Sequence, residues 1–215
     1  MTARAWTIAA VAACAACGGK LPETRYYQLA VAAPPAHGDD RVLVLDALAT
    51  DAGYDDERIV YRTTPFRVDY YQYHRWTSAP GVMVGNFLEQ GLEHTGKFRA
   101  VVRDMSPDAP VVLAGRVLAI EEVDRSKTEW LGRIVLELVL TDARTSEVVW
   151  TEQFEETEPL RQQTPEGLAA ALSIAMSRIV AQTAPVVAEL ADRQARAHAE
   201  QPATTAAARV MRRVR

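Results

Sequence analysis

The chain contains little cysteine, and none of it lies where it could stabilise a folded domain. Both cysteines, Cys14 and Cys17, fall near the N-terminus of the 215 residues. Small exported domains often rely on disulfides, and no pair remains after residue 17 to form one. A zinc site in the rest of the chain would also need an unusual ligand set without cysteine. The placement of the two thiols therefore favours a processing site.

The chain also lacks an apolar run long enough to span a bilayer. A transmembrane helix needs about 20 consecutive apolar residues. The run Ala5–Ala13 is too short, and the best later run, Ile134–Leu140, is interrupted by Glu137. Residues 1–16 instead have the charged start, apolar middle and small-residue end of a secretory signal peptide. We expect a soluble domain on a tether after this signal.

The small residues around the two cysteines resemble a bacterial lipobox, which predicts a covalent N-terminal lipid such as palmitate. Cys17 is the preferred site, because it gives the apolar run a more usual length and precedes two glycines that suit a flexible exit. Cys14 is the alternative. The residue three positions before it is Val11, which fits the lipobox pattern better than Cys14, the residue three positions before Cys17. We expect this lipid to be the only bound group, with residues 17–24 as the tether.

The residues after Cys17 also indicate a location. Neither Gly18 nor Gly19 is the aspartate that retains enterobacterial lipoproteins in the inner membrane. This resemblance predicts anchoring in the inner leaflet of the outer membrane, facing the periplasm. Seven residues separate Cys17 from the first predicted strand at Arg25 and reach roughly 25 Å at most. We therefore expect the domain to stay close to the leaflet.

Features of enzymes and nucleic-acid binders are scarce. The 24 basic and 28 acidic residues give a mildly acidic balance, so we expect no nucleic-acid partner. No Gly-x-Ser-x-Gly, phosphate-loop or His-Glu-x-x-His motif is present. We predict no catalytic residue, no metal site and no enzymatic activity. The histidines are scattered at His37, His74, His94 and His198.

Carboxylates cluster at two places, and we interpret both clusters as solvated. The group from Asp51 to Glu57 lacks the spacing of a known calcium loop and is typical of an acidic turn. Glu121, Glu122 and Asp124 follow an apolar run, and we expect them at an exposed strand end.

Hydrophobic periodicity predicts a single α+β domain over residues 25–192, in which two main helices cover a mostly antiparallel sheet. The first helix runs from Pro80 to just before Gly96, with Ser78 as a candidate cap. The second starts near Thr164, and we expect Pro185 to kink or interrupt it. We expect residues 193–215 to form a basic, disordered tail. The predicted strands are Arg25–Ala30, Arg41–Leu48, Arg58–Arg62, Phe66–Tyr73, Phe98–Arg103, Val111–Val123, Glu129–Thr141 and Glu147–Glu155.

The segment from Phe66 to Trp76 is the richest in aromatic and arginine side chains, the types that dominate contact energy at protein interfaces. On a strand, Tyr71 and Tyr73 would face one way and Tyr70 the other. One face could pack in the core while the other meets a partner, and core packing would explain Trp76 in particular. The predicted partner interface comprises Arg67, Tyr70, Tyr71, Tyr73, Arg75 and Trp76.

Several short motifs, in this order, resemble the ABC-type transport auxiliary lipoproteins. The resemblance extends from Cys17 to about Leu190, and the basic tail beyond the second helix departs from it. The motifs are Arg25-Tyr26-Tyr27-Gln28-Leu29, Val42-Leu43-Val44-Leu45, Ile59-Val60-Tyr61-Arg62, and Tyr70 to Trp76 leading into Ser78-Ala79-Pro80-Gly81.

The resemblance implies a non-catalytic lipoprotein of an intermembrane lipid transport system, anchored in the outer membrane. It would dock to an MCE-domain protein and, through that protein, serve an inner-membrane ABC transporter. The resemblance leaves open whether the protein forms a homo-oligomer. The alternative function is a lipoprotein that itself binds an apolar ligand between helix and sheet.

Overall fold

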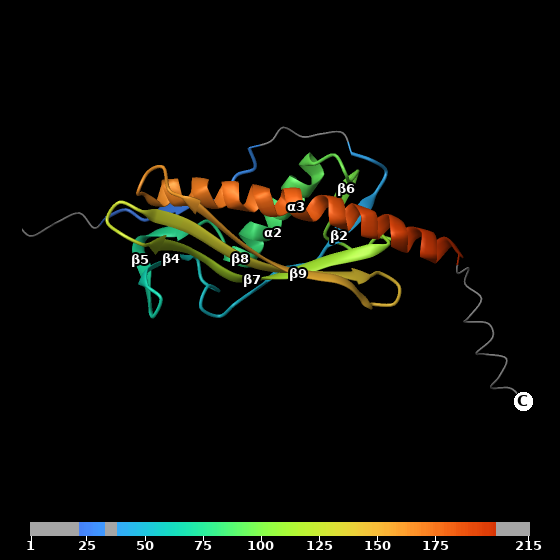
Figure 1. The fold of residues 1–215 in the computed structure, drawn as a ribbon, viewed down its shortest axis with the longest axis horizontal. Coiled ribbons are helices and arrows are strands. Elements are labelled where there is room, and N and C mark those ends of the chain that lie inside the picture. Colours follow the sequence, from blue (N-terminus) through green and yellow to red (C-terminus); the bar gives the residue numbers. More distant parts are fainter. Residues whose placement is uncertain (1–21, 33–37, 201–215) are drawn as a thin grey trace, which may run out of the picture.

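The computed structural model describes residues 22–32 and 38–200, which form two layers (Figure 1). One layer is a mixed sheet of nine strands, and the other consists of helices α2 (Pro80–His94) and α3 (Pro165–Glu200) on one face of it. This arrangement confirms the predicted α+β class. The strands are β1 (Arg25–Tyr27), β2 (Val42–Leu45), β3 (Ala49–Thr50), β4 (Arg58–Thr64), β5 (Arg67–Trp76), β6 (Ala100–Val102), β7 (Val111–Asp124), β8 (Trp130–Asp142) and β9 (Val148–Pro159).

Three long antiparallel strands, β7, β8 and β9, form the body of the sheet. Their apolar residues alternate in a way that buries one face under the helices; on β8, for example, Ile134, Leu136 and Leu138 are fully buried. The predicted turn between β8 and β9 is present. The Asp142 carboxylate accepts hydrogen bonds from the N–H groups of Arg144 and Thr145, and Ser146 takes a positive φ of 60°.

The short strands pair in parallel, which the sequence did not indicate. Strand β7 pairs in parallel with β2, then β3, then β4 at successive positions along its length. Two further parallel pairs lie at the edges of the sheet, β1 with β5 and β6 with β2. The sheet is mostly antiparallel as predicted, because the long pairings and the β4–β5 hairpin are antiparallel. The predicted single strand Arg41–Leu48 is wrong in detail: β2 ends at Leu45, and β3 starts only at Ala49.

The helices pack against each other as well as on the sheet. Gly91 of α2 lies close enough to α3 that a Cβ there would be 2.9 Å from a methyl group of Val180. The Thr164 hydroxyl caps α3 by accepting from the Gly167 N–H at 3.0 Å. The candidate cap Ser78 does not act in this way, because α2 starts after Ala79 with no side-chain hydrogen bond.

Helix α3 corrects two further expectations. It runs unbroken through Pro185, whose ring lies on the exposed side, so that the carbonyl freed at exposed Ala181 can be hydrated. It also continues to Glu200, so residues 193–200 of the expected tail are helical; residues 201–215 lie outside the described residues. Tertiary contacts hold this end, including an ion pair of Asp192 with Arg41 at 2.6 Å and a hydrogen bond between His198 Nε2 and the Asp142 carboxylate at 2.6 Å.

By length and composition α3 could cross a membrane, since its best 18-residue window has a mean hydropathy of 1.4. Half of that window is buried inside the domain. Leu168, Leu172 and Ile179 are among its fully buried side chains. The apolar side of α3 therefore already has a partner in the sheet and α2, as expected for the core helix of a folded domain.

The contact between α3 and β8 depends on Gly132. A Cβ at this position would lie 3.2 Å from the Ala171 Cβ and from the Leu172 Cγ. We expect Gly132→Val to lower the free energy of unfolding by about 1–3 kcal/mol through overpacking, measured by urea denaturation. Gly53→Ala is the control, because a Cβ there meets nothing within 4 Å and should leave the midpoint nearly unchanged. Equal midpoints for both variants would contradict the close packing of α3 on β8.

Candidate interaction site

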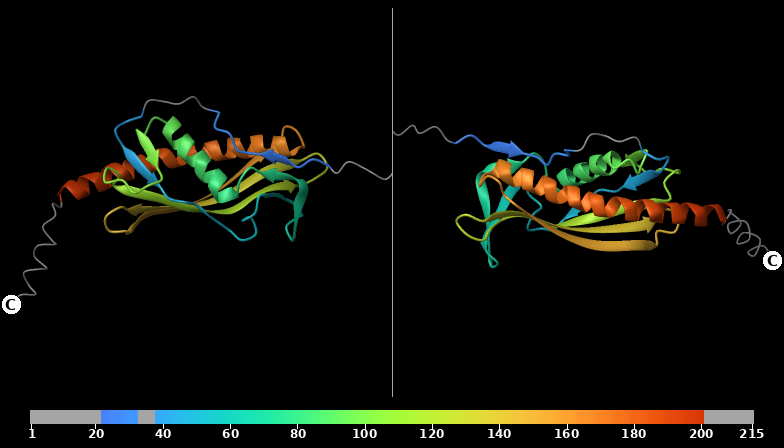
Figure 2. Two further views of the ribbon diagram at one scale, coloured as in Figure 1. Left: turned by 180° about the vertical axis from the view of Figure 1, so that it is seen from behind. Right: turned by 45° about the horizontal axis from the view of Figure 1, so that its top comes forward.

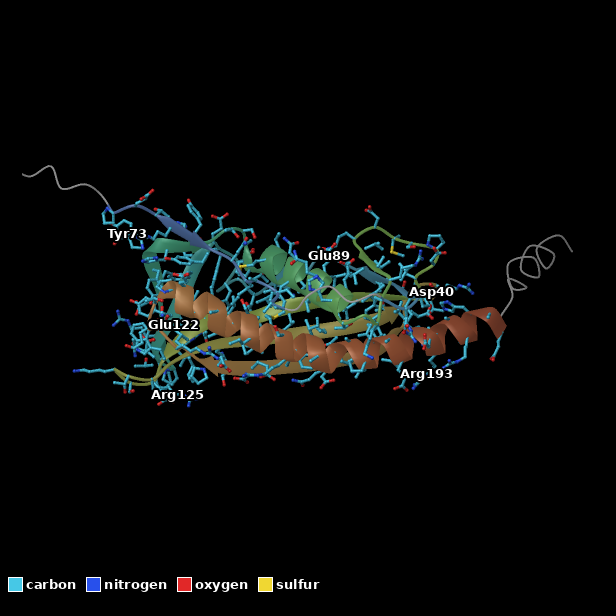
Figure 3. The ribbon with its side chains drawn as sticks, turned by 90° about the horizontal axis from the view of Figure 1, so that it is seen from above. Asp40, Tyr73, Glu89, Glu122, Arg125 and Arg193 are labelled. Carbon is cyan, nitrogen blue, oxygen red and sulfur yellow. The ribbon has the colours of Figure 1, made fainter. Side chains whose placement is uncertain are left out.

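Two consecutive glutamates near the end of β7 are buried, which corrects the expectation that they are solvated. Glu121 is 1% exposed and Glu122 is 0% exposed. Successive side chains of a strand point to opposite faces, so each carboxylate needs its own compensation. Both find it in side chains from β4, β5 and their surroundings, at the end of the molecule where Tyr73, Glu122 and Arg125 gather (Figure 3).

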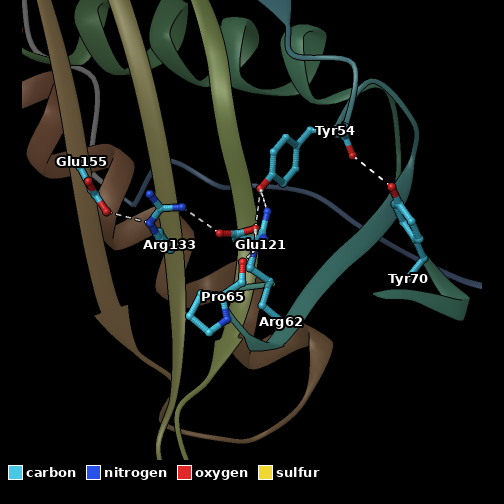
Figure 4. Close-up of polar contacts among 8 residues, drawn as sticks. Tyr54, Arg62, Pro65, Tyr70, Glu121, Arg133 and Glu155 are labelled. Carbon is cyan, nitrogen blue, oxygen red and sulfur yellow. Dashed lines mark hydrogen bonds and ion pairs between the residues drawn. The ribbon is translucent and has the colours of Figure 1, made fainter. Parts of the chain in front are cut away.

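Glu121 lies on the sheet face opposite the helices and is surrounded by donors (Figure 4). Arg62 of β4 donates to it at 2.6 Å and Arg133 of β8 at 2.8 Å, and the Tyr54 hydroxyl donates at 2.5 Å. Arg133 also pairs with Glu155 of β9 at 2.7 Å. Burial and the hydrogen bond to Glu121 raise the pKa of Tyr54, so this phenol stays neutral. This network ties β4 to β7 and to the turn at Tyr54, and through Glu121 and Arg133 to β8 and β9.

Glu122 is held from the other side by an aromatic cluster. The Tyr71 hydroxyl donates to its Oε1 at 2.8 Å, and burial raises the pKa of Glu122 to about 7. Burial also raises the pKa of nearby Asp124. In the described part of the chain, Glu122 Oε2 and Asp124 Oδ1 meet no other donor, which suits one proton shared by these two carboxyl groups.

The aromatic cluster continues from Tyr71 to β1. The ring of Tyr71 lies 5.1 Å from that of Tyr61 and 5.5 Å from that of His74. His74 Nδ1 shares a hydrogen bond of 2.9 Å with the Tyr27 hydroxyl of β1. Burial and the neighbouring Arg25 lower the pKa of His74, so the imidazole is neutral at pH 7. A continuous set of contacts thus links β7, β5 and β1.

The predicted partner interface separates into buried and accessible parts. Trp76 is 1% exposed and belongs to the core, so its inclusion in the interface is wrong, and the alternative of core packing holds for it. Tyr71 is half-buried with its hydroxyl on Glu122. Tyr70 is accessible at 38%, with the Arg58 guanidinium 4.2 Å from its ring centre. The remaining members keep some exposure: Arg67, which pairs with Asp69; Tyr73; and Arg75, which lies 3.8 Å from Asp56.

The same end of the molecule carries exposed apolar side chains outside the predicted set. Tyr26 of β1 is 59% exposed, and Val68 of β5 is 39% exposed. Phe66, in the turn between β4 and β5, is 98% exposed. Exposed apolar side chains therefore lie on β1, on β5 and in the turn before it.

The described residues hold no group of three or more His, Cys, Asp or Glu side chains that could bind a metal ion. Of the β7 carboxylates, Glu121 accepts from arginine and tyrosine donors on both oxygens, and Glu122 accepts from the Tyr71 hydroxyl on one. The geometry at this end is that of an accessible surface supported by a buried polar network.

Two solved structures share the fold. A crystal structure of a protein from Xanthomonas campestris is 19% identical in sequence, covers 83% of this chain and 100% of its own, and superposes with a TM-score of 0.68. A second crystal structure, of an uncharacterised protein, is 15% identical, covers 77% of this chain and 99% of its own, and has a TM-score of 0.64. A sequence search of curated proteins finds no match.

The family model described as "ABC-type transport auxiliary lipoprotein component" matches residues 27–184. The chain belongs to this family. The match extends from β1 well into α3 and includes both buried glutamates and the aromatic cluster. The predicted resemblance is thereby confirmed, and the chain is a lipoprotein component associated with an ABC-type transport system.

The burial of Glu122 predicts a specific dependence of stability on pH. Its pKa is about 7 in the folded state, above its ordinary value of 4.5, so between these values the folded state retains a proton that the unfolded state has lost. The free energy of unfolding should therefore decrease as pH rises through this window, by at most about 1.4 kcal/mol per pH unit.

Glu122→Gln keeps the acceptor for Tyr71 and removes this titration. We expect the variant to gain stability relative to the wild type as pH rises from 4.5 to 7, in urea denaturation measured at several pH values. The matched control, Glu152→Gln, replaces an exposed glutamate of β9. Parallel curves for Glu122→Gln and the wild type would contradict a protonated, buried Glu122.

Proposed function

We propose that the protein is a lipid-anchored docking subunit that connects the outer membrane to an intermembrane lipid transport system. In this proposal Cys17 carries the lipid, the domain faces the periplasm, and the partner is an MCE-domain protein served by an inner-membrane ABC transporter. The membership in the auxiliary lipoprotein family carries the proposal. The signal-like residues 1–16 and Cys17 support it from the sequence and lie outside the described residues.

The accessible part of β5 is the proposed docking surface. Tyr70 presents an aromatic ring already stacked by a guanidinium, and Tyr73 and Arg75 offer partly exposed side chains farther along the strand. Side chains of these types give large contact energies because they combine apolar area with a polar group. Their backbone is fixed by the pairing of β5 with both β4 and β1, so little conformational entropy is lost on binding.

The alternative, an apolar ligand held between helix and sheet, has weaker support. A hollow between α2 and α3, lined by residues such as Phe87, Gly91 and Val180, has a volume of about 200 Å³. Pockets that enclose drug-sized ligands usually measure about 300–1,000 Å³. We therefore favour docking over ligand carriage. Mass spectrometry of gently extracted protein tests this preference, since a stoichiometric co-purified lipid would reverse it.

Lipid attachment is tested by substitution of the proposed acceptor. We expect Cys17→Ser protein to be exported but unlipidated, because no thiol remains at the preferred site. Mass spectrometry of the mature N-terminus and separation of membrane and soluble fractions check this outcome, with Cys14→Ser as the matched control that should keep its lipid. A lipid found on Cys14 in the wild type would contradict the proposed site but leave the lipoprotein assignment intact.

Partner docking is tested by pull-down of the MCE-domain protein. We expect Tyr70→Ala and Arg75→Ala to weaken capture by about tenfold or more when combined, as the loss of two interface contacts of about 1 kcal/mol each would do. The melting temperature should change little, because both side chains are partly exposed.

Val148→Ser is the control for docking, because Val148 is 62% exposed at the start of β9 and lies outside the proposed surface. Its capture should equal that of the wild type. An equal loss of binding and melting temperature in the β5 variants would instead assign these side chains to the core. Unchanged capture in all variants would contradict docking through β5.

A further inference from the structure

The turn between β4 and β5 projects from one end of the molecule, on the side of the sheet away from α3 (Figures 1 and 2). Pro65 and Phe66 form this turn, and Val68 follows at the second position of β5. Phe66 is 98% exposed, the largest value among the exposed large hydrophobic side chains of the described residues. No contact inside the domain requires a phenylalanine at this position.

The apolar side chains here occupy the outer positions of the hairpin. Phe66, Val68 and Tyr70 alternate along the chain and are 98%, 39% and 38% exposed. A solvated sheet face normally carries polar residues at such positions. Phe66 protrudes at the turn almost fully exposed, beside the partly exposed Val68, and such an apolar tip indicates contact with something outside the domain.

The start of β1 lies at the same end of the molecule as this turn (Figures 1 and 2). β1 pairs in parallel with β5, Arg25 lying opposite His74, so the chain before Arg25 approaches from the side on which β5 begins. The eight positions from Phe66 to His74 span at most about 26 Å along the strand. The tether from Cys17 to Arg25 reaches roughly 25 Å. A lipid on Cys17 therefore keeps the bilayer within reach of the turn.

We propose that the β4–β5 turn, residues 65–68, inserts its apolar side chains into the surface of the bilayer that holds the lipid anchor. This inference rests on the lipid attachment in the proposed function and adds a second membrane contact to it. A phenylalanine at a protruding turn suits the interfacial region of a bilayer, where apolar rings are removed from water without leaving the polar backbone unpaired.

The contact is apolar rather than ionic. Arg67 is the basic side chain of the turn, and its guanidinium already pairs with the Asp69 carboxylate at 2.7 Å. Its charge is therefore largely compensated within the hairpin. Insertion should consequently persist at high ionic strength and in vesicles without anionic lipid, in contrast to binding driven by basic residues, which salt screens.

Two membrane contacts would fix the orientation of the domain. A single acyl anchor on a short tether leaves the body free to rotate. An inserted turn on β5 would hold β1 and β5 toward the leaflet and leave the other end, where the last residues of α3 lie, directed into the periplasm (Figure 1). The docking surface around Tyr70 and Tyr73 would then lie close to the membrane.

The experiment uses the purified lipidated protein with a single introduced thiol, Phe66→Cys, labelled with an environment-sensitive fluorophore and reconstituted into vesicles. The lipids are phosphatidylethanolamine and phosphatidylglycerol, or phosphatidylcholine alone, with and without a nitroxide-labelled quencher lipid. Val148→Cys is the matched control, because Val148 is also well exposed but lies on β9. Unsubstituted protein labelled in parallel reports any thiol left by processing.

We expect the probe at position 66 to show a blue-shifted emission and to be quenched by the nitroxide lipid in both vesicle types and at high salt, and the probe at 148 to show neither effect. Val68→Cys provides a second position in the same turn and should respond like position 66. Binding to the vesicles is measured by flotation. Protein that floats with the vesicles but shows a water-exposed, unquenched probe at positions 66 and 68 contradicts only the insertion. Protein that does not float contradicts both the lipid anchor and the insertion, and pull-down of the partner is independent of either result.

Discussion

The structure of the β4–β5 end depends on the burial of two consecutive carboxylates of β7. Glu121 and Glu122 point to opposite faces, and the energetic cost of dehydrating each is offset only by side chains brought from elsewhere. Arg62 and Tyr54 donate hydrogen bonds to Glu121, and Tyr71 donates one to Glu122. Because β4 pairs with β7 over only a few residues, these polar contacts add to the backbone pairing that holds the hairpin on the sheet.

This constraint connects the core to the proposed activities. With Tyr71 and Trp76 directed inward, the alternate residues of β5 are left outside, and Tyr70 and Val68 become available to partners. β1 joins the same assembly through the hydrogen bond of Tyr27 to His74. The first strand of the described domain is therefore attached to the surface that we propose for docking.

Sequence patterns predicted the elements whose burial follows a simple period. The apolar stripe of α3 from Leu168 to Ile179 and the alternation along β8 lie where the pattern indicated. The parallel pairings of β1, β2 and β3 escaped prediction, because such short strands are selected by tertiary neighbours rather than by their own sequence. Pro185 was expected to disrupt α3, but packing on both sides of it maintains the helix.

The site was only partly predictable for a related reason. A run of acidic residues at the end of a strand usually lies in water, and the partners that bury Glu122 come from Tyr71, about 50 residues earlier in the chain. The signal that could have indicated burial is the position of Glu121 and Glu122 within an otherwise apolar strand, opposite Arg133 of the next strand. The aromatic segment was recognised, whereas the division between its core and surface members required the bend of β5 and its pairing with β1.

We propose that this end of the domain meets the transport partner in the cell. Photocrosslinking from a photoreactive amino acid at position 70, compared with one at position 148, tests it most directly when the crosslinked products are identified by mass spectrometry in intact cells. We expect a crosslink between position 70 and an MCE-domain protein, with none from position 148. Crosslinks to that protein from position 148 alone, or from neither position while lipidation and folding are intact, would contradict it.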